Sequence, residues 1–110
     1  MTIEVLARSI AQLGSLTQSV GGRIAVAVTD TRELWIVDLS HEGGRWTREP
    51  IGADCTLVAS SRALSSFGDP EALEAAILGG ELAVMGAIDK LQAIAKLVDE
   101  GPGWAARAAA

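Results

Sequence analysis

Few residues in this sequence could carry out covalent chemistry, and they are separated along the chain. There is one cysteine, Cys55, and one histidine, His41. Nucleophilic catalysis needs a Ser or Cys, a base within reach and a group that orients the base. His41 falls in the segment HEGGR, which is typical of a solvated turn, whereas Cys55 falls in an alternating apolar segment, where cysteine is usually a small, inert core residue. The sequence therefore predicts no catalytic residue.

Metal and cofactor motifs are missing as well. One His and one Cys do not make a zinc site. The three Gly-Gly pairs lack the GxxxxGK[ST] and GxGxxG spacings that cradle phosphates. Asp38 and Asp54 show no setting that would separate two carboxyl pKa values for acid–base work, and Asp69 precedes Pro70 as a helix cap. We predict no metal and no cofactor; an enzyme using Cys55, His41 or an aspartate on an apolar substrate is the alternative.

The first half of the chain would position these residues on one helix and four strands. Apolar residues recur at helical spacing from Ile3 to Leu13, and Gly14 interrupts the pattern. Short alternating or β-branched segments then predict strands at 23–29, 34–39, 45–48 and 53–59. We expect these strands to follow one another in the sheet as a meander.

The second half returns to helical spacing. We predict a short helix from Ser60 through Phe67, a helix beginning at Asp69-Pro70, a strand at 81–85, a helix at 88–98 and a loosely held tail from about 101. The expected fold is a single α+β domain over residues 1–110. Its five-stranded, mostly antiparallel sheet would be covered by helices on one face.

Composition excludes several classes of protein. The chain has 110 residues, a net charge of −5 and a mean hydropathy of +0.31. Nucleic-acid binders usually carry a basic surface, so this balance argues against nucleic acid as a partner. No apolar run approaches the roughly 20 residues of a membrane span, so stable membrane insertion is not expected. A single cysteine suits a reducing compartment, and we expect a cytoplasmic location.

The second-half helices carry many medium-sized apolar residues for a sheet of modest area. Residues of this type either fill a core or line a ligand cavity, and composition alone does not separate the two. They are Leu64, Phe67, Leu73, Ile77, Ile88, Leu91 and Ile94.

Four strings in a fixed order resemble one known family. They are GGRIAVAVTD from Gly21, LWIVDLS with Trp35, ADCTLVAS from Ala53, and GGELAVMGAIDKLQAIAKL from Gly79. Together with the preceding helix they resemble the sterol carrier protein-2-like lipid-transfer domain, over roughly residues 13–98. Each string alone is weak, but their order is more specific.

The resemblance implies an apolar tunnel between the sheet and the helices that holds a fatty acyl, sterol or isoprenoid ligand. It adds Trp35 and Met85 to the seven apolar candidates above. The helix at 88–98 would be a movable lid, held by few constraints at either end. We expect Leu91→Asn to weaken ligand retention more than stability. The remaining alternatives are an enzyme-associated domain with the same cavity, and a filled domain that forms a homodimer.

Overall fold

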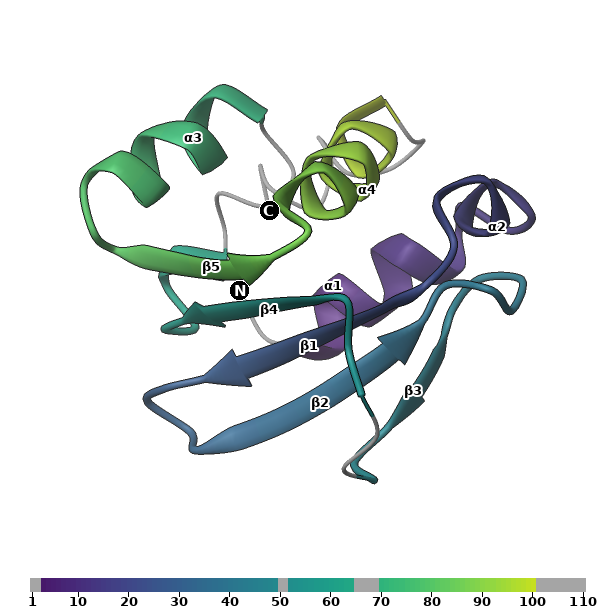
Figure 1. The fold of residues 1–110 in the computed structure, drawn as a ribbon, viewed down its shortest axis with the longest axis horizontal. Helices are drawn as coiled ribbons and strands as arrows, with labels where there is room; N and C mark the ends of the chain where they lie inside the picture. The colour runs from purple at the N-terminus through teal and green to yellow at the C-terminus, as the bar shows by residue number, and fades with distance from the viewer. Residues whose placement is uncertain (1–2, 50–51, 65–69, 101–110) are drawn as a thin grey trace.

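A curved sheet with helices packed against it makes up the computed structural model, which describes residues 3–49, 52–64 and 70–100 (Figure 1). Every predicted strand is present, with bounds that differ by one or two residues. In chain order the elements are α1 (Ile3–Ala11), α2 (Leu16–Val20), β1 (Arg23–Val28), β2 (Glu33–Asp38), β3 (Arg45–Thr47), β4 (Cys55–Ala59), α3 (Pro70–Leu78), β5 (Leu82–Gly86) and α4 (Ile88–Glu100).

The helix breaks follow from local chemistry. Gly14 has a positive φ of 56°, a conformation that favours glycine, and it separates α1 from α2. After β4, the Ser60 hydroxyl accepts a hydrogen bond from the Ala63 N–H at 3.1 Å, which caps a short turn through Leu64. The rest of the helix predicted to reach Phe67 lies outside the described residues, as do the Asp69 cap and the tail from 101.

The sheet is mostly antiparallel, as predicted, but its strands do not form a four-strand meander. The strand order is β3-β2-β1-β4-β5. Of the four strands predicted to form the meander, β1, β2 and β3 lie side by side in chain order, but β4 does not pair with β3. Instead β4 pairs with β1 in parallel, and β5 pairs with β4 antiparallel. The meander prediction was wrong because the chain after β3 crosses β2 and β1 before β4 begins (Figure 1). Alternation within a strand defines its faces but not its neighbours.

The two faces of the sheet have different surroundings. Ile24, Val26, Cys55 and Leu57 point to one face and belong to the same buried cluster as Leu6, Ile10 and Leu39. The helices contribute Leu73, Leu91 and Ile94 to that cluster, so the core lies on the helix side of the sheet, as expected. On the opposite face, Leu34 and Met85 are about half exposed, at 49% and 58%.

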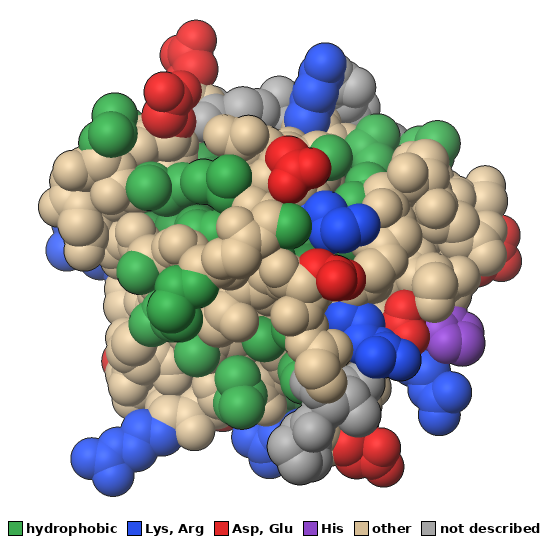
Figure 2. Space-filling model, in the orientation of Figure 1, with side chains coloured by type: hydrophobic (Ala, Val, Ile, Leu, Met, Phe, Trp, Pro, Cys, Tyr) green, Lys and Arg blue, Asp and Glu red, His purple; other side chains and the backbone are tan. Residues whose placement is uncertain are grey.

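Hydrophobic side chains are unevenly distributed over the face of the molecule drawn in Figure 2. In Figure 2 the hydrophobic side chains are concentrated on the side where β5 and α3 lie, and His41, the single histidine, lies among charged side chains on the opposite side. Among the helices of the described ranges, none combines the length and hydropathy needed to cross a bilayer.

Candidate functional site

The apolar residues expected around a ligand divide into a buried group and a scattered group. Four of them converge at the centre of the helix side with exposures of 0 to 2%: Leu64, Leu73, Leu91 and Ile94. Ile77 is half-buried and packs against them. The structure therefore brings five of the nine candidates into one cluster between α3, α4 and the sheet.

Met85 lies on the other side of the sheet. In the β4–β5 register Met85 is opposite Thr56, whereas Val84 is opposite the buried Leu57. Because successive side chains of a strand point to opposite faces, Met85 faces away from the helices and does not lie with the cluster. In an alternating five-residue strand, the sequence does not show which set of side chains faces the helices until the pairing of the strand is known.

The other candidates also lie apart from the cluster. Ile88, the first residue of α4, is 39% exposed. Trp35 lies on the helix side, but against α1 rather than against α3 and α4. Phe67 lies outside the described residues.

A groove between α3 and α4 lies over the buried cluster. It has a volume of about 210 Å³ and is lined by Leu73, Glu74, Ile77, Gln92 and Lys96. Leu73 belongs both to this α3–α4 groove and to the core, where it is 2% exposed. The groove therefore lies directly over the buried cluster, and its lining combines the apolar Leu73 and Ile77 with three polar side chains.

A second groove, of about 440 Å³, separates α4 from α2. At one end of it, the Lys90 ammonium donates hydrogen bonds to the backbone oxygens of Val20, at 3.2 Å, and Gly21, at 3.5 Å. These carbonyl groups belong to the end of α2, where helix carbonyls lack partners within the helix and favour a cation. Lys90 therefore ties the first turn of α4 to the end of α2.

The joint before α4 is also more constrained than the sequence predicted. The Ala87 N–H donates to the Asp54 carbonyl at 2.9 Å. Gly86 has a φ of 91°, and a Cβ there would collide with the same carbonyl oxygen. The expectation that few constraints hold the helix at either end was therefore wrong for its N-terminal end. Backbone packing against β4 and the Lys90 contact hold that end.

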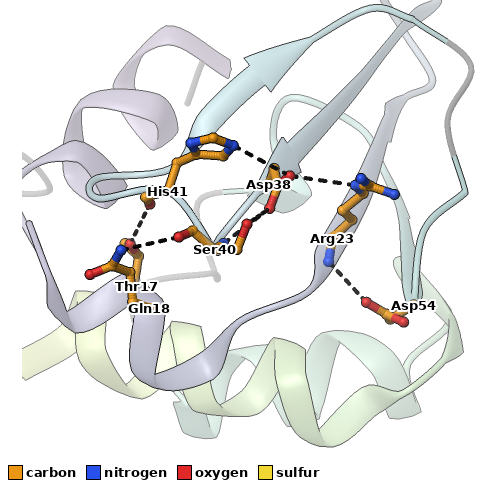
Figure 3. A network of polar contacts seen from close by, with 7 residues as sticks. All are labelled: Thr17, Gln18, Arg23, Asp38, Ser40, His41 and Asp54. Atoms are coloured by element: carbon orange, nitrogen blue, oxygen red, sulfur yellow. Dashed lines mark hydrogen bonds and ion pairs between the residues drawn. The ribbon is translucent and has the colours of Figure 1, made fainter.

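Polar side chains gather at the end of the sheet where β1 and β4 begin and β2 ends (Figure 3). The Asp38 carboxylate lies 3.5 Å from Nε of Arg23 and 3.8 Å from Nε2 of His41. The Asp54 carboxylate accepts a hydrogen bond from the Arg23 N–H at 2.9 Å. The turn after β2 is fixed to α2, since the Thr17 hydroxyl donates to the His41 carbonyl at 2.9 Å. His41 thus lies at the surface beside a carboxylate, in the turn predicted for it.

Asp38 is stabilised as a carboxylate. Its Oδ1 accepts hydrogen bonds from the Ser40 hydroxyl at 2.5 Å and from the Ser40 N–H at 3.0 Å. These bonds hold the pKa of Asp38 below its usual range, with smaller help from His41 and Arg23. A carboxylate with a lowered pKa is a weak base, so these contacts are suited to holding the β2 turn in place.

Cys55 is buried in β4, with 1% exposure. Burial raises the pKa of the thiol, and the negative charges of Asp89 and Asp54 raise it further. We expect a maleimide to label native Cys55 far more slowly than an introduced Ala93→Cys, since Ala93 lies on the exposed side of α4. Labelling is followed by mass spectrometry at neutral pH, with and without urea. Equal native rates at the two positions would contradict this and favour the enzyme alternative.

Sequence reasoning missed two features of this region. Nothing in the periodicity of residues 88–98 indicates that Lys90 contacts the end of α2. The position of Trp46 was also missed, although a hairpin through the turn at 40–44 would have suggested it, because that pairing sets Trp46 opposite Val37.

Comparison with known proteins agrees with this architecture. A model of the SCP-2 sterol transfer family matches residues 3–99. A UbiJ-SCP2 ubiquinone synthesis protein of known structure is 28% identical, covers 87% of this chain and 79% of its own, and superposes with a TM-score of 0.68. Curated proteins give no match.

Two more distant solved structures share the fold. The apo form of sterol carrier protein 2 from Yarrowia lipolytica is 20% identical over 88% of this chain and 79% of its own, with a TM-score of 0.59. The inverting sec-alkylsulfatase Pisa1 from Pseudomonas sp. is 18% identical over 76% of this chain but only 14% of its own, with a TM-score of 0.62. With the family model covering nearly the whole chain, from α1 to the end of α4, this protein belongs to the SCP-2 sterol transfer family.

Proposed function

We propose that this protein is a lipid carrier that holds a fatty acyl, sterol or isoprenoid ligand between the helix side of the sheet and the helices α3 and α4. The observation that carries the proposal is the continuity of the α3–α4 groove with the buried cluster through Leu73. A lipid entering at this groove would meet aliphatic side chains directly below the rim. Each methylene removed from water contributes about 0.8 kcal/mol, so binding needs no covalent chemistry.

Loading requires a conformational change. Leu91 and Ile94 of α4 have 0% exposure in the closed structure, so the cluster has no room for a chain-length ligand until α4 moves. The Lys90 and Ala87 contacts hold the N-terminal end of α4. The remaining freedom is a swing of α4 away from α3, with the α2 side as the pivot. This motion would open the α3–α4 groove into the cluster.

The proposal also covers the setting of the protein. The single cysteine suits a reducing compartment, so we place the carrier in the cytoplasm. The net charge of −5 makes nucleic acid an unsuitable partner. The ligand to test first is an isoprenoid quinone, because the 28%-identical relative is a ubiquinone synthesis protein.

Native mass spectrometry tests the proposal. We expect protein taken from cells, or incubated with vesicles containing a fatty acid, a sterol and an isoprenoid quinone, to carry the added mass of one apolar molecule. Extraction with organic solvent should remove that mass. Protein that carries no added mass, both as taken from cells and after incubation with these vesicles, would overturn the proposal. A dimer mass in that unliganded protein would instead support a filled domain that dimerises.

A further inference from the structure

Two exposed aliphatic side chains extend the two sides of the α3–α4 groove. Leu78 on α3 is 82% exposed and follows Glu74, a lining residue of the groove, by four positions. Ile88 on α4 is 39% exposed and precedes Gln92, a lining residue on the other side, by four positions. Residues four apart in a helix lie on the same face, one turn apart. Each side of the groove therefore continues into one exposed aliphatic side chain, and we call Leu78 and Ile88 the rim pair.

The rim pair is too small to form a protein–protein interface. In the described ranges, the other exposed large hydrophobic side chains lie away from the groove, on α2 or on the sheet face opposite the helices: Leu16, Leu34 and Met85. A stable protein interface buries about 800 Å² on each partner, far more than two side chains supply. A lipid surface can take up single aliphatic side chains and binds them more strongly as their apolar area increases. The rim pair therefore suits a lipid surface better than a second copy of the chain.

The charges around the rim pair are mostly negative. Four exposed acidic residues lie on α3, on α4 and in the turn between α3 and β5: Glu71, Glu74, Glu81 and Asp89. Lys96 lines the groove, whereas the Lys90 ammonium is bound to carbonyl groups at the end of α2. Anionic lipids attract basic segments and repel acidic ones, and this interaction acts within a Debye length of the surface. The surroundings of the rim pair therefore favour a bilayer without net charge.

We propose that the rim pair docks the protein on a zwitterionic bilayer, with lipid passing between Leu78 and Ile88 into the α3–α4 groove. The proposal rests on the proposed carrier function and adds the surface that loads the lipid and the kind of membrane that it contacts. Only two aliphatic side chains enter the lipid, so the contact is brief and reversible.

An environment-sensitive label measures docking without any lipid uptake. Leu78→Cys and Ile88→Cys are each labelled with a nitrobenzoxadiazole thiol reagent, and mass spectrometry verifies a single label, since Cys55 is buried. We expect the emission to increase and shift to the blue at both positions when phosphatidylcholine vesicles are added. Labelled Leu34→Cys is the matched control, because Leu34 is 49% exposed on the opposite face of the sheet. An equal response at Leu34, or no response at either member of the rim pair, would overturn the docking surface.

The lipid composition tests the charge argument. Replacing part of the phosphatidylcholine by phosphatidylglycerol should weaken the response of the label at Leu78 in low salt. The response should recover in about 0.5 M sodium chloride, where charges are screened over a few ångströms. A stronger response to the anionic vesicles would overturn the preference for a membrane without net charge.

Transfer kinetics connect docking to the carrier function. We expect Leu78→Ser to slow the transfer of cis-parinaric acid from phosphatidylcholine vesicles about fivefold, because less apolar surface enters the bilayer. Its affinity for the same fatty acid delivered from solution should stay unchanged, and Leu34→Ser should change neither quantity. Transfer by Leu78→Ser as fast as by the wild type would overturn the proposal. Wild-type protein that binds no fatty acid from either source would instead overturn the carrier function, whereas the labels at the rim pair would still report docking.

Discussion

A reversible cross-link between α3 and α4 is expected to abolish lipid uptake. Glu74 on α3 and Gln92 on α4 are exposed and line the same groove, so Glu74→Cys with Gln92→Cys provides two accessible thiols. A short bis-maleimide with an internal disulfide would join them and prevent α4 from swinging away. Uptake of cis-parinaric acid and of a fluorescent sterol should be lost, and should return when a reductant cleaves the linker. The buried thiol of Cys55 should not interfere.

A second cross-link on the other side of α4 is the matched control. Ser19 and Ala93 line the groove between α2 and α4, where Lys90 already holds the helix. The same reagent on Ser19→Cys with Ala93→Cys joins the expected pivot and should leave uptake largely intact. Uptake that persists with α3 joined to α4 would show that the lipid enters elsewhere. Loss of uptake with both cross-links, including the one between α2 and α4, would show that the whole helix must detach.

Leu91→Asn is expected to lower the stability of the fold severely. The sequence alone suggested a mild cost to the fold, because Leu91 was taken to face a cavity. In the structure Leu91 has 0% exposure within the core cluster, so asparagine would leave a void and bury an amide. We now expect the free energy of unfolding to fall by about 3–5 kcal/mol. Against a typical total of about 5–15 kcal/mol, this is a severe loss.

Urea unfolding followed by circular dichroism measures this effect. Leu91→Met keeps the apolar volume and should lower the free energy of unfolding by less than about 1.5 kcal/mol. A loss below about 1 kcal/mol for Leu91→Asn would mean that water reaches the inner side of α4. That result would support an open cavity beside Leu91 and the mild cost to stability that the sequence alone suggested.

The sequence predicts elements well where one periodicity dominates. The stripe of Ile88, Leu91, Ile94 and Ala95 identified α4, and alternation identified the central strands. Pairing could not be predicted, because alternation says nothing about which strand lies beside β1. For the same reason Met85 was assigned to the ligand site, although the register turns it away from the helices.

The candidate site could be predicted only where it depends on the apolar pattern of the helices. Leu64, Leu73, Leu91 and Ile94 do converge, since the apolar stripe of an amphipathic helix such as α4 faces the core. The contact of Lys90 with the end of α2, and the surroundings of the Trp46 indole, depend on distances between segments far apart in sequence. Residue type and spacing carry no information on such distances.

The parallel pairing of β1 with β4 has a consequence during synthesis on the ribosome. β1, β2 and β3 can form a hairpin pair as soon as residue 47 has emerged, but β1 then has one unpaired edge until β4 is made. That nascent edge belongs to the strand carrying Ile24, Val26 and Val28, an apolar row that still lacks the cover of α3 and α4. An unpaired apolar edge is prone to aggregation. The chain therefore stays dependent on prompt translation of β4, and pausing codons between residues 47 and 59 should favour misassembly.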